Sequence, residues 1–519
     1  MTGDEAAPAG VFPLKKRPAT ALALLSGLLY FLAFPGVDLW PLGFVAFVPL
    51  LLALRAQRPR TGAGLGWLAG FTMTMCGFYW LLDMLKIFSG FPTALCLVFM
   101  SILCAYQAGR MALCGWLYAR AAHRGWPAGV AFAAAFTASE LLFPLLFPWA
   151  YAATVHQIPA LLQLAELGGP IAVGLVLVAA NLAIAEPIVA KLEGRKPRMR
   201  VAGALAGVPV AAAIYGLVRI PMVDAQTRAA PKARVGIVQA NMSLMGKRHS
   251  KQEGLRRHLA LTRELQAAGP LDLVVWSETS VVSPQDEEIA AAMYRNQFTA
   301  SLGAPAIFGA VLVRRVDDAR GYVLFNSALL SDARGEVTGR YDKQFLLAFG
   351  EYLPFGEQFP KLYEISRNSG RFTPGKTLAP LQLDGHGLAT FICYEDISAS
   401  FVRSIVRTGP TDLLVNITND AWFGDTTEPW IHLALAKLRA VEHRRFLVRS
   451  TNSGVSAFVD PVGRVAGHTG TFRQEAIAAE IAWLRPWTLY GALGDAPWWI
   501  VSAAALGMAF FRRREPKGE

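Results

Sequence analysis

A cysteine, a lysine and a glutamate in the second half of the chain could together carry out nucleophilic catalysis. Cys393 follows the apolar run LATFI, Glu278 follows LDLVVWS, and Lys343 follows RYD. A thiol attacks as its thiolate, so it needs a base, and a glutamate can supply one. We expect the Lys343 ammonium group to favour that thiolate and to stabilise an oxyanion. The trio therefore predicts covalent catalysis with Cys393 as the nucleophile.

The residues between positions 232 and 485 predict the elements that position this trio. Apolar runs rich in β-branched residues alternate with amphipathic stretches, which favours an α/β sheet covered by helices. In such sheets, functional groups gather beyond the carboxyl ends of strands, where Glu278, Lys343 and Cys393 all lie. The expected strands are 235–239, 271–276, 306–313, 323–330, 337–341, 388–393 and 413–417, and the expected helices are 251–268, 287–302 and 430–446.

The rest of the chain is too apolar for an ordinary water-soluble domain. Of the 519 residues, 53% are hydrophobic and only 17% are charged, and the mean hydropathy is +0.35. Soluble domains usually carry roughly a quarter charged residues, whereas a membrane helix needs about 20 apolar ones. We predict seven membrane segments before residue 220 and an eighth near the end, at about 20–35, 39–54, 62–85, 91–119, 126–149, 159–190, 201–217 and 487–511.

Lysine and arginine in the short loops predict how these segments are oriented. Both residue types concentrate before the first segment and after the second, fourth, sixth and eighth segments. Because basic loops stay on the cytoplasmic side, we expect both termini in the cytoplasm and the α/β domain outside. The predicted parts are a cytoplasmic tail (1–19), seven membrane helices (20–220), an outer catalytic domain (221–485), an eighth helix (486–511) and a cytoplasmic tail (512–519).

The charged and metal-binding residue types exclude several other classes of protein. The formal charge of +12 is explained in large part by membrane topology, so we expect no nucleic-acid partner. His432 and His443 show no zinc-like spacing, and no phosphate-binding loop or dinucleotide motif occurs, so we expect no metal and no cofactor. Within the apolar segments, Glu140 is expected to make structural hydrogen bonds and Arg110 to snorkel toward the cytoplasm.

The motifs around the trio resemble those of the nitrilase superfamily. VVWSET, RYDKQFLLAFGEYLPFGE and FICYED are similar to its Glu-Lys-Cys centre, which implies an α-β-β-α sandwich domain. The seven-plus-one segments, FPW at 147–149 and the block from NITNDAWFGD to VDPVGRV at 416–465 resemble the apolipoprotein N-acyltransferase family in particular. The implied fold is a multi-pass α-helical membrane bundle of seven plus one helices that carries a nitrilase-like domain.

This resemblance implies a role for each residue that matches a family motif. Glu278 is implied as the general base, Lys343 as the oxyanion stabiliser and Cys393 as the nucleophile. The residues implied to support this centre are Glu351, Tyr394 and Glu395.

Two departures and a set of candidate lipid contacts accompany the resemblance. Ser277 stands where a proline is common, and the stretch at 245–248 lacks a tryptophan often found near there. The apolar residues in the segment after Lys343 have two interpretations. They could pack in the core, or they could guide acyl chains. The candidates for contact with substrate are Trp276, Leu346, Phe349, Trp422 and Phe423.

The implied activity is acyl transfer from a phospholipid, through a Cys393 thioester, to the N-terminal diacylglyceryl-cysteine of an apolipoprotein. The implied partners are these two substrates and the bilayer of the bacterial cytoplasmic (inner) membrane, with a periplasmic catalytic domain and a monomeric chain. One alternative is a membrane-tethered hydrolase with the same trio and water as the acceptor. Another is a transporter with an accessory outer domain, which would need polar pathways through segments that hold few charges.

Overall fold

The structure is a computed structural model that divides into two compact units. The first unit holds residues 1–81, 94–220 and 492–519, and the second holds residues 82–93 and 221–491. Phe349, the stretch at 245–248 and the outer parts of both predicted tails lie outside the described residues. The structure describes residues 13–243, 251–318, 320–348, 350–353, 355–365 and 370–513.

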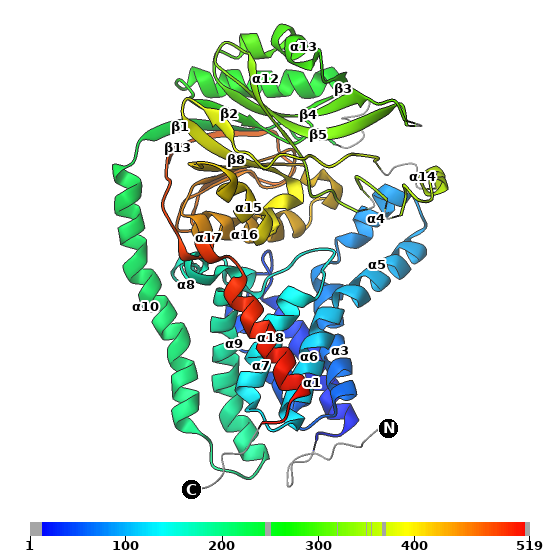
Figure 1. Cartoon of the computed structure of the whole chain (residues 1–519), viewed down its shortest axis with the longest axis vertical. Helices are drawn as coiled ribbons and strands as arrows, with labels where there is room; N and C mark the ends of the chain where they lie inside the picture. The colour runs from blue at the N-terminus through cyan, green and yellow to red at the C-terminus, as the bar shows by residue number, and fades with distance from the viewer. Residues whose placement is uncertain are drawn as a thin grey trace. The chain divides into compact units, whose positions relative to one another are not determined.

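The first unit is a bundle of apolar helices (Figure 1). Three described helical stretches are long and apolar enough to cross a membrane, namely Thr93–His123, Ala165–Leu192 and Met199–Ala229, and a bent pair of helices could add a fourth. The predicted count of seven plus one spans therefore stays a prediction. The main helices are α1 (Lys16–Leu32), α2 (Val48–Leu54), α3 (Pro59–Gly77), α5 (Thr93–Gln107), α6 (Gly109–His123), α7 (Ala128–Leu142), α8 (Pro159–Leu162), α9 (Ala165–Leu192), α10 (Met199–Ala229) and α18 (Ala496–Phe510).

Glycines allow α3 and α6 to pack against each other at close range. A Cβ atom at Gly115 would lie 2.2 Å from the Gly62 carbonyl oxygen, and one at Gly66 would lie 2.1 Å from the Met111 carbonyl oxygen. These distances are too short for any side chain, so only glycine fits. Such contacts matter in a membrane, where helices associate through close packing rather than through the hydrophobic effect.

Two expectations for the helical unit need correction. The predicted segment 159–190 is interrupted near its start, because Gly169 has φ +64° and is followed by Pro170, which has no N–H to donate. Arg110 does not snorkel to the membrane edge. It is buried, and its Nη1 lies 2.6 Å from Glu140 Oε1. The carboxylate of Glu140 thus makes the structural contact that was expected of it.

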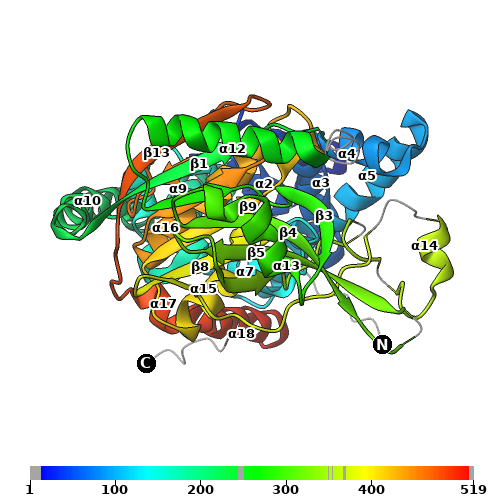
Figure 2. The same ribbon diagram turned by 90° about the horizontal axis from the view of Figure 1, so that it is seen from above.

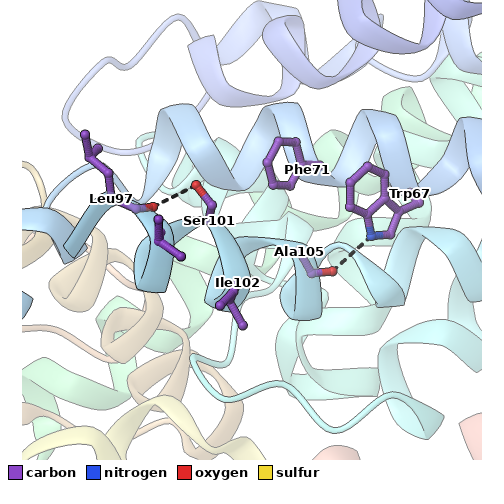
Figure 3. A pocket seen from close by; sticks show the side chains of 7 residues that line it. Trp67, Phe71, Leu97, Ser101, Ile102 and Ala105 are labelled. Carbon is purple, nitrogen blue, oxygen red and sulfur yellow. Dashed lines mark hydrogen bonds between the residues drawn. The ribbon is translucent and has the colours of Figure 1, made fainter. Parts of the chain in front are cut away.

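An apolar groove runs along the outside of this unit between α3 and α5 (Figure 3). Trp67 and Phe71 line it from α3, and Ile102 lines it from α5, around a volume of about 430 Å³. Its one hydroxyl group, on Ser101, donates to the Leu97 carbonyl oxygen at 2.8 Å. Trp67 Nε1 likewise donates to the Ala105 carbonyl oxygen at 3.0 Å. Because both polar side chains are satisfied internally, this groove suits contact with hydrocarbon.

The second unit contains two sheets. The first sheet has the order β13-β1-β2-β4-β5-β6, and β3 pairs with β4, whereas the second has the order β12-β11-β10-β9-β8-β7. The strands are β1 (Lys232–Gln239), β2 (Leu273–Trp276), β3 (Val281–Asp286), β4 (Ala306–Arg315), β5 (Tyr322–Ser331), β6 (Val337–Asp342), β7 (Leu381–Leu383), β8 (His386–Ile392), β9 (Leu413–Thr418), β10 (Leu447–Thr451), β11 (Ala457–Val459), β12 (Val465–His468) and β13 (Glu475–Ala482).

Helices cover the outer faces of the two sheets and complete an α-β-β-α sandwich (Figures 1 and 2). The sheets face each other in the middle, where the Ser450 hydroxyl of β10 donates to the Val275 carbonyl oxygen of β2 at 3.0 Å. Parallel strands buried on both sides read as continuous apolar runs, which is why β2 and β9 were predictable. The covering helices are α12 (Lys251–Ala267), α13 (Ala290–Gln297), α15 (Ala399–Thr408) and α16 (Glu428–His443).

Candidate active site

Glu278 enters the space between the sheets from a sharp turn after β2. The turn uses a left-handed backbone at Thr279, with φ +49°. It also crosses β4 at Gly309, where a Cβ atom would lie 2.3 Å from the Thr279 nitrogen. Buried Glu278 accepts a hydrogen bond from Asn326 Nδ2 at 2.7 Å. A glycine in β4 is therefore part of what allows Glu278 to reach the site.

Lys343 follows β6 directly and lies between two carboxylates. Its Nζ atom is 2.8 Å from Glu351 Oε2 and 3.5 Å from Glu278 Oε1, and its side chain is only 2% exposed. Burial alone would lower the pKa of Lys343, but the carboxylates of Glu351 and Glu278 hold this pKa well above its ordinary value. Lys343 is therefore an ammonium ion in a site with one cation and two carboxylates.

Asn326 is a member of this site that the sequence analysis missed. Its Nδ2 donates to Glu278 Oε1 at 2.7 Å and to Glu351 Oε1 at 2.9 Å, so one amide group holds both carboxylates. The Leu347 N–H also donates to Glu351 Oε2, at 2.9 Å. The sequence did contain a signal for it, because Asn326 is the one amide in the largely apolar strand β5. A polar side chain buried in such a strand needs hydrogen-bond partners.

Cys393 occupies a strained turn immediately beyond β8. It begins the short 3-10 helix η4 (Cys393–Ile397), and its backbone has φ +55°. This left-handed conformation costs a non-glycine residue roughly 1–3 kcal/mol and recurs at functional sites. Asn416 Nδ2 donates to the Cys393 carbonyl oxygen at 3.1 Å and so helps to hold the turn.

The electrostatic effects on the Cys393 sulfur oppose one another. Burial and the carboxylate of Glu278 raise the pKa of Cys393 well above its ordinary value, although Lys343 acts in the opposite direction. Lys343 favours the thiolate, as expected, but burial and the Glu278 carboxylate together outweigh its effect. The resting sulfur is a thiol, so it must lose its proton when it attacks.

Glu395 connects the turn that carries Cys393 to the segment that carries Lys343. Burial raises the pKa of Glu395 to about 7, against backbone hydrogen bonds that favour the anion. Its carboxyl group accepts four hydrogen bonds, from the N–H groups of Ile392 (2.7 Å), Gln344 (2.7 Å) and Phe345 (3.0 Å) and from the hydroxyl of Tyr341 (2.8 Å). These contacts fix the two segments relative to each other.

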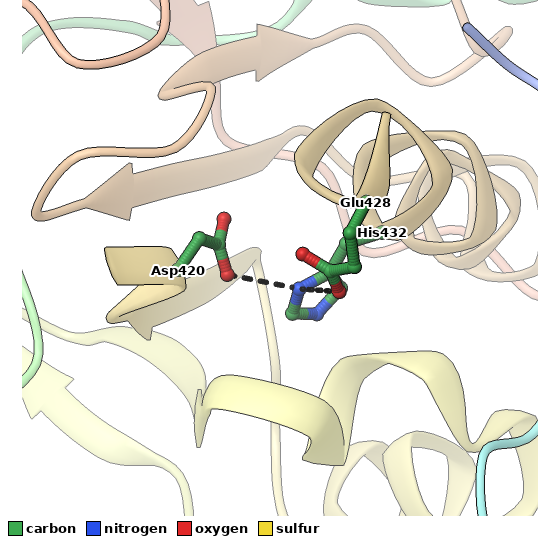
Figure 4. Close-up of side chains that lie close together, drawn as sticks. All are labelled: Asp420, Glu428 and His432. Carbon is green, nitrogen blue, oxygen red and sulfur yellow. Dashed lines mark hydrogen bonds and ion pairs between the residues drawn. The ribbon is translucent and has the colours of Figure 1, made fainter. Parts of the chain in front are cut away.

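Tyr394 leads from the cysteine turn into a buried network of charged groups. Its hydroxyl donates to Glu428 Oε1, and its ring stacks on His432 with the centroids 4.7 Å apart. His432 Nε2 lies 2.8 Å from Asp396 Oδ1. Its Nδ1 lies 3.2 Å from Asp420 Oδ1 (Figure 4). Burial lowers the pKa of His432, but these two carboxylates outweigh it and raise the pKa to about 9.

Asp420, Glu428 and His432 lie close enough together to surround a metal ion, but their contacts fit an imidazolium ion better (Figure 4). Both ring nitrogens of His432 face carboxylates and so carry protons, which leaves no lone pair for a metal. Arg449 further neutralises the carboxylates, at 2.7 Å from Asp396 and 3.0 Å from Asp420. The cluster is a buried salt-bridge network, which the sequence did not reveal.

Two of the candidate substrate contacts are packed inside the sandwich. Trp276 is fully buried, its Nε1 donates to Thr262 Oγ1 at 3.0 Å, and its ring stacks on Phe298. Phe423 is also fully buried and packs edge-on against the ring of Tyr394, with the centroids 5.6 Å apart. The expectation that these two rings contact substrate is corrected, because both belong to the core.

Two of the other candidates lie nearer the surface. Leu346 and Trp422 are each half-buried. In the apolar run that was expected either to pack in the core or to guide acyl chains, Phe345 is 47% exposed and Phe355 is 70% exposed. The sequence analysis did not single out Phe359, which is 64% exposed. The segment after Lys343 thus presents apolar rings to its surroundings.

The fold and this site define a class of protein, and comparison with known families supports that class. Residues 234–485 match the carbon-nitrogen hydrolase family, and this range corresponds to the sandwich. Residues 26–183 match the apolipoprotein N-acyltransferase N-terminal domain, which corresponds to the helical unit. The chain is therefore a carbon-nitrogen hydrolase domain joined to a helical membrane region.

Relatives similar over nearly the whole chain narrow this class further. Apolipoprotein N-acyltransferases from Pseudomonas putida and Azotobacter vinelandii are 31% and 32% identical to it, and each alignment covers 96% of this chain and at least 96% of the relative. The enzyme of the same name from Geobacter metallireducens is 29% identical over 95% of both chains. The chain belongs to the apolipoprotein N-acyltransferase family.

Proposed function

We propose that this protein transfers an acyl chain from a phospholipid to the α-amino group of an N-terminal diacylglyceryl-cysteine on an apolipoprotein. Family membership over the full length of the chain supports the substrates. The single observation that carries the chemistry is the placement of buried Lys343 between Glu278 and Glu351, beside the Cys393 turn. Such a centre suits acyl transfer through a covalent intermediate.

In the first half-reaction, the Cys393 sulfur attacks the ester carbonyl carbon of the phospholipid. Glu278 accepts the thiol proton as the bond forms, which a sulfur with a raised pKa requires. Lys343 and the Tyr394 N–H stabilise the negative charge on the carbonyl oxygen. The C–O bond then breaks, Glu278 returns the proton to the leaving alcohol, and a lysophospholipid departs from the thioester.

In the second half-reaction, the α-amino group of the acceptor attacks the thioester carbonyl carbon. Glu278 accepts a proton from the attacking nitrogen, and Lys343 again stabilises the oxyanion. The C–S bond breaks, Cys393 recovers its proton, and the acyl chain remains on the acceptor as an amide. Because the lysophospholipid leaves a covalent acyl-enzyme before the acceptor reacts, we expect ping-pong kinetics.

Supporting roles follow from the hydrogen bonds around this centre. Glu351 and Asn326 act as positioning residues, because they hold the lysine and the base. Glu395 keeps the nucleophile and the lysine segment in register. Tyr394 provides an N–H to the oxyanion, while its side chain anchors the turn in the network behind it.

The membrane topology follows the distribution of basic loops. We assign seven helices before the catalytic domain and one after it, in the bacterial cytoplasmic membrane, with both termini in the cytoplasm and the catalytic domain in the periplasm. The chain acts as a monomer. Leu346 and Trp422, together with the exposed rings of Phe345 and Phe355, contact the acyl chains of the substrates.

Mass spectrometry of the purified protein after exposure to a phospholipid with a labelled acyl chain tests this proposal. We expect the label on the peptide that contains Cys393, and none there in Cys393→Ala. Addition of a diacylglyceryl-cysteine peptide should then move the label into an amide product. Labelled free fatty acid without amide would instead support the hydrolase, and an unlabelled Cys393 would overturn the covalent route.

A further inference from the structure

We propose that the helical unit binds an anionic phospholipid of the cytoplasmic leaflet, in a cavity separate from the catalytic centre. The cavity has a volume of about 720 Å³ and lies at the end of the bundle where α2, α6 and α9 finish and α7 and α10 begin. All its lining residues belong to the first unit. The inference does not depend on the acyl-transfer reaction.

The walls of this cavity are apolar and suit acyl chains. Leu182 and Val189 line it from α9, Val130 lines it from α7, and Val201 and Leu205 line it from the first turns of α10. Val130 is 56% exposed and Val201 is 49% exposed, so this wall is open rather than packed. A hydrocarbon chain placed here would cover apolar surface on three helices.

The lining of the cavity also includes charged groups that are already paired with one another. Arg195 lies 2.7 Å from Glu186 and 2.6 Å from Glu193, and Arg55 lies 3.9 Å from Glu193. Both carboxylates that line the cavity are thus neutralised by guanidinium groups. Among the described residues that line the cavity, no carboxylate is left without a guanidinium partner.

Two further arginines supply the excess positive charge. Arg198 and Arg513 both line the cavity, and within the described part of the chain neither side chain forms a salt bridge. Four arginines therefore face two glutamates around one opening. A phosphodiester group fits guanidinium donors well, and a cluster of basic residues at the cytoplasmic surface attracts anionic lipid.

The groove between α3 and α5 differs from this cavity in its lining (Figure 3). Its lining contains no charged residue, so it can take an acyl chain but cannot select a headgroup. The cavity that Arg198 and Arg513 line combines the same kind of apolar wall with an excess of arginines. That combination matches a phospholipid with a net negative headgroup, such as phosphatidylglycerol, rather than a free phosphate ion.

Native mass spectrometry of the full-length protein tests this site. Cys393→Ala protein, which cannot turn over the lipid, is stripped of native lipid and given phosphatidylglycerol and phosphatidylcholine with identical chains. We expect one tightly bound phosphatidylglycerol at this cavity, in addition to any lipid held at the catalytic centre. The double variant R198Q/R513Q should bind it about 30-fold more weakly, as expected for the loss of two arginine contacts at a membrane surface.

Matched variants separate the cavity from general surface charge and from misfolding. R58Q/R60Q removes two exposed arginines at the α2–α3 turn and should leave binding unchanged. Leu205→Trp fills the cavity without changing its charge, so it should also weaken binding. If R198Q/R513Q does not fold, Leu205→Trp tests the site in its place. Equal binding of both lipids, displacement by inorganic phosphate alone, or wild-type binding by R198Q/R513Q would overturn the proposal.

Discussion

The helical unit and the sandwich both bury charged side chains, but the helical unit pairs its buried charges one to one. Arg110 meets Glu140 at 2.6 Å, and Arg219 meets Glu166 at 2.7 Å. Each pair is further satisfied by a tyrosine hydroxyl, from Tyr30 in the first case and from Tyr215 in the second. Because each guanidinium group is matched by one carboxylate, these pairs serve the structure of the helical unit.

At the candidate site of the sandwich, by contrast, the buried charges are not paired one to one. Lys343 is shared by Glu278 and Glu351, and Cys393 lies where a further negative charge is disfavoured. An arrangement of this kind is costly in the resting state and is held by the residues around it. The balance of charge, more than burial itself, therefore separates the candidate active site from a structural pair.

The largest expected effect is that of Cys393→Ala on activity. Because the sulfur forms the covalent intermediate in the proposed mechanism, we expect acyl transfer to fall by roughly 10⁴-fold or more. The change removes one atom from a buried position, so the melting temperature should shift little. Transfer assays with labelled phospholipid and thermal unfolding in detergent check both expectations, and substantial remaining transfer would show that the strained turn is structural.

The second largest expected effect is the loss of stability when a buried salt bridge in the helical unit is broken. Arg110→Met leaves Glu140 buried without its cation and should destabilise the protein by roughly 3–5 kcal/mol. Adding Glu140→Leu to Arg110→Met should restore most of that loss, because no unpaired charge remains. Thermal unfolding of the three proteins measures this. A double variant as unstable as the single variant would mean that the pair does more than neutralise itself.

The network behind Tyr394 should make stability depend on pH. The folded pKa of His432 is raised from 6.5 to about 9, so its contribution is complete below pH 6.5 and is lost as the pH rises toward 9, by about 3 kcal/mol. The pKa of Glu428 is raised to about 8, and its ionisation weakens the fold in the same direction.

His432→Asn should therefore flatten the fall in melting temperature between pH 6.5 and 9, whereas Glu428→Gln should flatten only part of it. The groups that face His432 are the carboxylates of Asp396, Asp420 and Glu428 and the guanidinium group of Arg449. An unchanged pH profile in His432→Asn would show that the imidazole is neutral in the folded protein.

The smallest expected effect concerns Asn326, which holds the two carboxylates of the site. Asn326→Leu keeps the size of the side chain but removes both hydrogen bonds, so kcat should fall about 100-fold with little change in KM. Ser331→Ala, on the same strand, is the matched control, because its hydroxyl has no partner among the described residues. Equal effects of the two variants would indicate a general fault in β5.

Much of the sandwich could be predicted because its signals are local. Continuous apolar runs such as 271–276 and 413–417 indicate strands buried on both faces, and they lie in β2 and β9. The strand β13 escaped prediction, because EAIAAEIA has a helical composition and becomes a strand only by pairing with β1. The placements of Trp276 and Phe423 were missed for a similar reason, since a motif does not show which side of a sheet a ring occupies.

The residues along the chain were enough to indicate an apolar region, an α/β region and the three reactive side chains after strands, because hydropathy and periodicity depend only on neighbours in sequence. Tertiary packing decided the rest. It brought Asn326 between two carboxylates, committed the charge of Lys343 to them, and left Cys393 as a buried thiol. Such electrostatic properties depend on distances between strands far apart in sequence, and on the exclusion of water, which arise only when the sheets close.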